Sequence, residues 1–156
     1  MTNKNKVRIF KLIKTKQKPA VKTRNPFSFI RNLFSTPTSK CLKSRADIAY
    51  LKGIECIKKL KYQEASDQFR LAAEDGHARA KFNMGVLYAL GMGLEQNDVK
   101  ALKWIEQSAL AFTCPEAHDC LYEMYKDGIL VEANLKDAQA HKHYANSIRR
   151  IALEGQ

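Results

Sequence analysis

The chain has 156 residues, 45% hydrophobic and 28% charged, which is the composition of a globular protein with room for one domain. Its formal net charge of +11 comes from one end, because residues 1–45 hold 13 basic residues and no acidic one, while the other 111 residues hold 14 basic and 16 acidic residues. The split excludes a basic nucleic-acid-binding domain as the folded part.

Cysteine usage and apolar runs bear on the compartment. No apolar run approaches the roughly 18 residues of a membrane-spanning helix, and basic residues interrupt every stretch that a secretory signal peptide would need. The four cysteines, Cys41, Cys56, Cys114 and Cys120, have unrelated spacings, which predicts reduced thiols rather than disulfides. We therefore expect an intracellular protein, cytoplasmic rather than secreted.

The first predicted element is a basic, largely unstructured N-terminal tail over residues 1–45. Pro19, Pro26 and Pro37 prevent one continuous helix, although apolar residues within 27–34 repeat at helical spacing. The tail has four alternative roles: a disordered arm, an arm that holds an anionic surface such as acidic lipid or RNA, a mitochondrial transit peptide, or a segment that docks on carboxylates of the same chain. The transit peptide is less favoured, because such peptides prefer arginine and the tail has nine lysines to four arginines.

From residue 46 onward the sequence predicts helices that repeat. Residues 80–109 align with residues 117–146 at a constant offset of 37, with six identities that include Tyr88 with Tyr125. A helix, a turn with glycine and a second helix explain each block. The fold class is therefore all-α, a short helix–turn–helix solenoid, or α/α superhelix, over residues 46–153.

Turn and cap residues place the elements of this repeat. Gly91 and Gly93 end one helix by supplying left-handed backbone positions, Asn97 caps the start of the next helix, and Pro115 starts another. The predicted units are residues 46–77, 78–114 and 115–146, followed by a C-terminal cap over residues 147–153.

The unit AKFNMGVLYALGMGLEQNDVKALKWIEQSA carries a family pattern in its Leu87-Tyr88 pair, its two turn glycines, Asp98, and Ala101 followed by Trp104. It resembles a Sel1-like repeat, the slightly longer relative of the tetratricopeptide repeat. The third unit departs from the pattern, since Tyr122, Leu130 and His141 stand in the places of Gly85, Gly93 and Trp104. The resemblance implies a non-catalytic protein–protein interaction module, an adaptor or scaffold, whose groove takes a protein or peptide partner.

The resemblance also implies that the first helix of each unit lines a concave surface. Phe82 and Val86 have an alternative role, which is packing against a neighbouring unit or the tail. The residues expected on the exposed side of those helices, and so the candidate partner-binding residues, are Tyr50, Ile54, Arg79, Phe82, Val86, Glu116, Asp119, Glu123 and Lys126.

Catalytic and metal-binding residues are weighed against structural roles. His118 and Cys120 are two apart on a predicted helix and point in divergent directions, as do His141 and His143, so with Cys114 they make a poor metal site. No GxSxG, HExxH or phosphate-loop pattern is present in the sequence. We therefore predict no catalytic, cofactor or metal site and expect that the protein is not an enzyme.

The charge split generates the alternative function, a peripheral protein attached to an anionic surface, acidic lipid or RNA, through residues 1–45. Four to six engaged basic residues give roughly micromolar to millimolar binding at about 1 kcal/mol each. The full chain should co-sediment with anionic but not neutral vesicles, and salt should abolish binding, because the Debye length falls from ~10 Å at 0.1 M to ~3 Å at 1 M. A chain without residues 1–45 is the control. If the deletion leaves both vesicle binding and RNA binding intact, the alternative function is contradicted.

Overall fold

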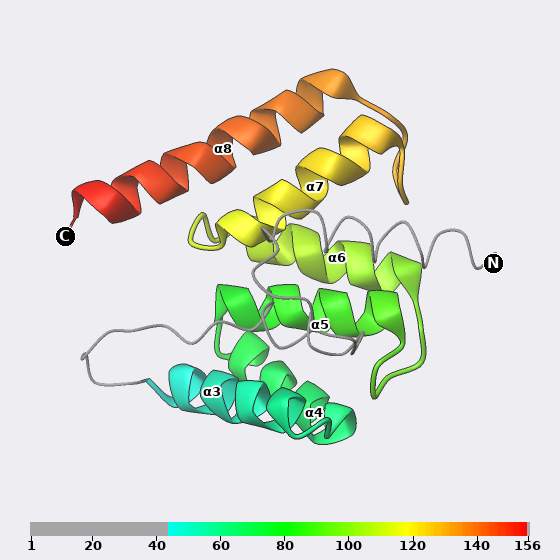
Figure 1. Cartoon of the computed structure of the whole chain (residues 1–156), viewed down its shortest axis with the longest axis vertical. Coiled ribbons are helices and arrows are strands. Elements are labelled where there is room, and N and C mark those ends of the chain that lie inside the picture. The colour runs from blue at the N-terminus through cyan, green and yellow to red at the C-terminus, as the bar shows by residue number, and fades with distance from the viewer. Residues whose placement is uncertain (1–43, 156) are drawn as a thin grey trace, which may run out of the picture.

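The computed structural model describes residues 44–155, and these form six α-helices and no strand (Figure 1). This confirms the predicted all-α solenoid; the predicted tail up to residue 43 lies outside the described residues. The helices are α3 (Arg45–Lys58), α4 (Tyr62–Glu74), α5 (Ala78–Leu90), α6 (Asp98–Ala109), α7 (Pro115–Asp127) and α8 (Leu135–Glu154). Arg45, counted above with the tail, is the first residue of α3.

Consecutive helices pack on one another in a stack. The closest packing is within three pairs, α3 with α4, α5 with α6 and α7 with α8, and the pairs are joined by α4 against α5 and α6 against α7. Other pairs of described helices make at most marginal contact. Figure 1 shows the resulting order, with the first pair at one end of the stack and the last pair at the other.

Side-chain caps fix where the helices begin. Ser44 and Asp47 form a reciprocal capping box at the start of α3. Asn97 and Asn134 cap α6 and α8 by accepting backbone N–H groups of the first helical turn. Pro115 occupies the first turn of α7, where its missing N–H is not needed. The cap expected at Asn97 and the helix start expected at Pro115 are confirmed.

The same turn follows α5 and α7. Gly91 and Gly128 end these helices in the left-handed conformation, at φ +64° and +65°. The chain then returns so that the next N-cap residue donates its backbone N–H to the preceding helix. These hydrogen bonds run from Asn97 N to the Tyr88 carbonyl at 3.0 Å and from Asn134 N to the Tyr125 carbonyl at 2.8 Å. The third pair therefore keeps the turn geometry of the second.

The second and third units differ at one position of this turn, where the second has Gly93 and the third has Leu130. Gly93 has φ +69°, and a Cβ atom there would collide with the backbone of Tyr62 and Gln63 at the start of α4. Leu130 stands at the equivalent position and adopts the same left-handed conformation, at φ +64°. In the third unit, Leu130 in place of the glycine therefore leaves the fold of the turn unchanged, although a left-handed backbone is unfavourable for a residue with a Cβ atom.

The core consists of two hydrophobic clusters. One lies between α3, α4 and α5 and includes Ile54 and Phe69, and the other lies between α5, α6 and α7 and includes Ile105 and Leu121. No residue of α8 belongs to either cluster. The core of the described chain therefore ends at α7 and its following turn.

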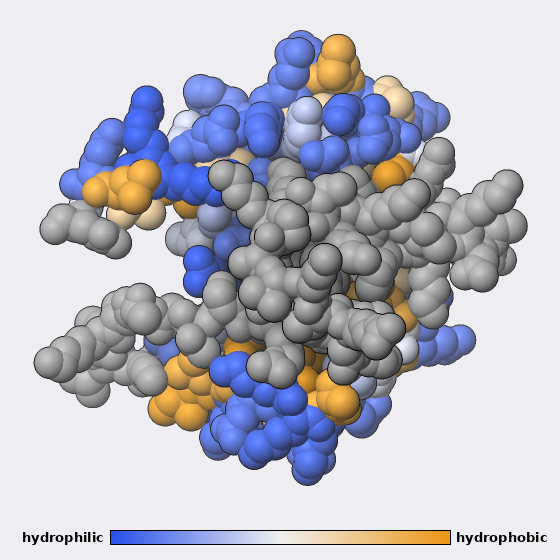
Figure 2. All heavy atoms as spheres, in the orientation of Figure 1, coloured by the Kyte–Doolittle hydropathy of each residue, from blue (hydrophilic) through white to orange (hydrophobic). Residues whose placement is uncertain are grey.

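The last helix runs on beyond its pair. Residues 147–153, predicted as the C-terminal cap, continue α8 as one helix of 20 residues. Ile151 and Leu153 are largely exposed there, and the space-filling view shows apolar side chains at the C-terminal end of α8 (Figure 2). No helix among residues 44–155 has the length and apolar character that a membrane crossing requires.

The close approach at Gly93 predicts a stability difference between two glycine-to-alanine variants. Gly76 also has a left-handed φ, +87°, but a Cβ there would meet nothing within 4 Å. In Gly76→Ala the free energy of unfolding should therefore fall by only the cost of backbone strain, about 1–2 kcal/mol. In Gly93→Ala it should fall by about 2 kcal/mol more, because α4 must move. Urea unfolding followed by circular dichroism measures both. Equal losses would mean that the turn does not press on α4.

Candidate functional site

Polar side chains from the first helices of the three pairs, α3, α5 and α7, lie within electrostatic reach of one another. Tyr50 of α3 lies within electrostatic reach of Arg79 on α5 and of Glu116 on α7. Its ring stacks on His77, with ring centroids 4.3 Å apart. Burial raises the pKa of Tyr50 to about 12, and Arg79 opposes that shift. Tyr50 is therefore an un-ionised, fixed ring at the centre of this group.

Asn83 lies next to the Tyr50 hydroxyl in the interior of the same face. The residue is buried, and its Nδ2 has no hydrogen-bond partner among the described residues. A buried donor without an acceptor costs stability. Asn83 thus places a buried polar group beside Tyr50, which belongs to the hydrophobic cluster between α3, α4 and α5.

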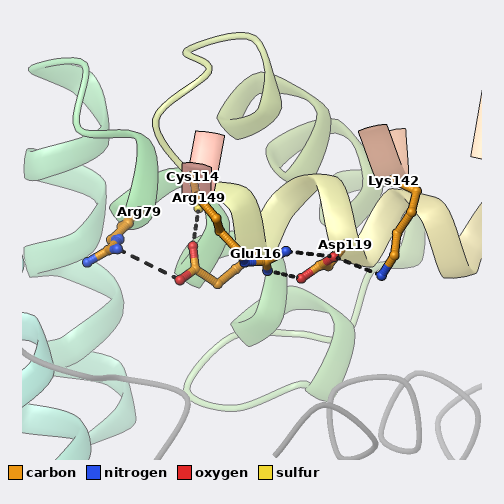
Figure 3. Close-up of polar contacts among 6 residues, drawn as sticks. All are labelled: Arg79, Cys114, Glu116, Asp119, Lys142 and Arg149. Atoms are coloured by element: carbon orange, nitrogen blue, oxygen red, sulfur yellow. Dashed lines mark hydrogen bonds and ion pairs between the residues drawn. The ribbon is translucent and has the colours of Figure 1, made fainter. Parts of the chain in front are cut away.

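A row of charged side chains crosses the face from α5 to α8 (Figure 3). We call it the charged row; its members are Arg79, Glu116, Asp119, Lys142 and Arg149. Arg79 reaches Glu116 at 3.8 Å, and Lys142 and Arg149 reach Asp119, the lysine at 3.9 Å. The signs of charge therefore alternate along the row.

The Arg79–Glu116 end of the row is open to solvent. The two side chains are 36% and 44% exposed, so their ion pair contributes little to stability. The Cys114 thiol donates to the other carboxylate oxygen of Glu116 at 3.3 Å. Burial raises the pKa of Cys114 to about 12, which keeps the sulfur protonated and makes it a poor nucleophile.

The Asp119 end is the enclosed part of the row. The side chain of Asp119 is only 9% exposed, and both guanidinium Nη atoms of Arg149 donate to its carboxylate. A two-point contact to a nearly buried carboxylate is stronger and more directional than an exposed pair. This contact ties the C-terminal half of α8 to α7.

Two further charged residues lie nearer the end of α7. Lys126 pairs with Glu123 at 3.6 Å, and this carboxylate raises the pKa of Lys126. Lys126 and Lys142 both lie over the ring of Tyr122, at 5.6 and 5.2 Å from its centroid. These residues extend the mixed charge of the face.

Four predicted groove residues lie in the core. Tyr50, Ile54, Phe82 and Val86 are buried and belong to the hydrophobic clusters, so their placement on the exposed side was wrong. The reason is that a first helix buries side chains in a cluster shared with its own partner and with the first helix of the next pair. Phe82 and Val86 lie in the cluster between α5, α6 and α7. Tyr50 and Ile54 lie in the cluster between α3, α4 and α5. Phe82 and Val86 pack against a neighbouring unit, which was the alternative role predicted for them.

The charged candidates lie nearer the surface. The side chains of Arg79, Glu116 and Lys126 are between about a third and a half exposed, while Asp119 and Glu123 are more enclosed. Asn83, Lys142 and Arg149 were not among the residues predicted from the sequence. Asn83 follows Arg79 by one helical turn, which is a usable signal. Lys142 and Arg149 lie on the second helix of the last pair, whereas the predicted groove included only residues of first helices.

The residues weighed as metal ligands do not form one cluster. His118 and His141 are brought together, with their Nδ1 atoms 3.0 Å apart, while Cys114 contacts Glu116 instead. Within residues 44–155 no group of three or more His, Cys, Asp or Glu side chains is arranged to hold a metal ion.

No family model matches the chain. The chain is 32% identical over 102 residues to an exopolysaccharide production negative regulator of Rhizobium leguminosarum bv. viciae and 30% identical over 87 residues to one of Rhizobium meliloti (strain 1021). These alignments cover 65% and 55% of this chain but only 36% and 32% of the relatives. The chain thus spans about a third of the length of the curated relatives it matches.

A solved structure resembles the fold. The crystal structure of a Sel1 repeat protein from Oxalobacter formigenes superposes with a TM-score of 0.57 at 23% sequence identity, over 67% of this chain and 42% of that chain. This likeness agrees with the helix pairs and with the turn that recurs at an offset of 37 residues. The chain therefore has the helical-repeat fold of Sel1 repeat proteins.

Proposed function

We propose that this protein is a non-catalytic interaction module that binds a protein partner along the charged row. The observation that carries the proposal is the convergence of α5, α7 and α8 on one face, where they present alternating charges. A helical-repeat fold supports this use, because stacked helices provide an extended surface.

The exposed end of the row is the proposed contact for the partner. The Arg79–Glu116 pair is 3.8 Å long and partly exposed, so breaking it costs little. A partner segment with a carboxylate and a basic side chain can replace both halves of this pair. Such complementarity contributes more to specificity and association rate than to affinity.

The relatives support a regulatory role. Both curated relatives are described as negative regulators of exopolysaccharide production. Regulation through a bound partner requires no catalytic group, and the buried, protonated Cys114 is poorly suited to be one. We propose that this protein also acts in regulation, as an adaptor.

The second candidate function is attachment to an anionic surface through residues 1–45. The observation that favours it is the concentration of 13 basic and no acidic residues in this segment. The two functions use different parts of the chain. Deleting the segment removes attachment to acidic lipid or RNA but leaves an adaptor's partner binding intact.

Site-specific photo-crosslinking tests the adaptor function. A photoreactive amino acid at position 116, in the charged row, should capture a partner in cells of the source organism. The same amino acid in place of the exposed Lys103, on α6, is the control and should not capture that partner. The captured protein is then purified for direct binding.

Charge reversal provides the quantitative test with the purified partner. Arg79→Glu should weaken binding at least tenfold, because it places two carboxylates side by side and repels an acidic partner group. Lys103→Glu makes the same change of charge on another helix and should alter affinity less than twofold. Equal effects of the two variants, with unchanged circular dichroism, would contradict binding at the charged row.

A further inference from the structure

The contact between α7 and α8 differs in chemistry from the equivalent contact between α5 and α6. In the second pair, Gly85 lets Ile105 lie directly against α5, where an added Cβ would collide with the isoleucine. At an offset of 37 residues the third pair has Tyr122 and Lys142, and the lysine lies over the tyrosine ring. Apolar interlocking in one pair is therefore replaced by polar contact in the next.

Helix α8 has few other attachments. Its only buried residues are Ala138 and Ala145, and neither belongs to a hydrophobic cluster. Among the described helices it packs substantially on α7 alone. Since two alanines bury little apolar surface, the polar contacts between α7 and α8 supply much of the attachment.

Two of those polar contacts join the helices through side chains. One is the Asp119–Arg149 ion pair described above. The other joins His118 of α7 to His141 of α8, whose Nδ1 atoms are 3.0 Å apart. His118 is 3% exposed, and its Nε2 has no hydrogen-bond partner among residues 44–155.

Aromatic rings lie beside both histidines of the pair. Phe112 and Tyr144 lie beside His118, with ring centroids 5.7 and 5.4 Å away. Tyr125 stacks on His141 at 5.6 Å with an interplanar angle of 12°. Water therefore has little access to the His118 ring, and a positive charge on that ring is poorly solvated.

The hydrogen bond between two Nδ1 atoms depends on protonation. It needs one N–H donor and one lone pair, so it forms when the pair is neutral or carries a single proton in excess. When both rings are protonated, both Nδ1 atoms are donors and two positive charges face each other. We propose that the His118–His141 pair is a pH-sensitive contact that holds α8 on α7 at neutral pH and releases it when both rings are protonated.

The surroundings of the two histidines favour their neutral forms, as the proposal requires. Burial lowers the pKa of His118, the neighbouring His141 lowers it further, and the Ala109 carbonyl and Asp119 oppose these effects. Burial also lowers the pKa of His141, against the influence of Asp137. The attached state thus binds fewer protons than the released state, so attachment is strongest above the ordinary histidine pKa of 6.5 and weakens as pH falls below it. The groups facing the pair are the Ala109 carbonyl of α6, Phe112 between α6 and α7, Asp119 and Tyr125 of α7, and Asp137 and Tyr144 of α8.

Release of α8 changes the charged row. Lys142 and Arg149 belong to α8, so both leave Asp119 when the helix detaches. Acidification therefore converts a row of alternating charges into one with fewer positive groups. The inference rests on the histidine contact and does not require the proposed partner.

Hydrogen exchange on the full chain tests the release. Between pH 7.5 and 5.5, after correction for intrinsic exchange rates, opening of α8 should rise at least tenfold, because two histidines gain protons on release. Opening of α5 and α6 should change less, which separates this event from effects of His77, whose pKa is also lowered by burial. An α8 response no larger than that of α5 and α6 overturns the proposal.

Two variants assign the response. His141→Asn keeps a polar side chain beside His118 but removes one titrating ring, so the ratio of α8 opening at the two pH values should fall several-fold. Because the readout is a ratio, it stays informative if the variant loosens α8 at both pH values. His143→Asn changes an exposed histidine of the same helix and should retain the wild-type ratio. A wild-type ratio in His141→Asn overturns the proposal.

Discussion

The distance to which two helices of a pair can approach is the constraint on which the rest of this structure depends. A Cβ atom on Gly53 would collide with the ring of Phe69, and one on Gly85 would collide with Ile105. The missing side chains let these large residues fill the space between helices, and both hydrophobic clusters form around them. Where Tyr122 replaces the glycine, the apolar core ends and polar contacts hold the last helix.

The same constraint shapes the face that bears the charged row. A helix such as α5 packs against other helices on two of its sides, so only a narrow strip of its surface is available for binding. That strip carries charged side chains whose pairs differ in burial, from the open Arg79–Glu116 pair to the enclosed Asp119–Arg149 pair. The open pair can be exchanged for a partner's charges, whereas the enclosed pair has a structural role.

The sequence predicts the architecture better than the site, for a physical reason. Turn glycines and N-caps such as Gly91 and Asn97 act on adjacent residues, so their effect is readable locally, and the 37-residue offset extends it to the next pair. The burial of Tyr50 and Phe82 depends on a second packing partner that helical periodicity does not reveal. The contact of His118 with His141 depends on how far apart α7 and α8 lie, which follows from side-chain volume across the pair. The tail predicted for residues 1–45 stays a prediction up to residue 43.

Packing between consecutive helices alone has a consequence for how the chain folds. Every substantial contact between the described helices joins neighbours in sequence, so no contact requires a long loop to close first. Contacts of low sequence separation favour rapid folding that nucleates locally and spreads. The middle pair, α5 with α6, has a neighbour on each side and supplies residues to both clusters. We therefore expect this pair to be the folding nucleus, and we expect the array to lose order from its ends, with α8 detaching before the helices that share a core.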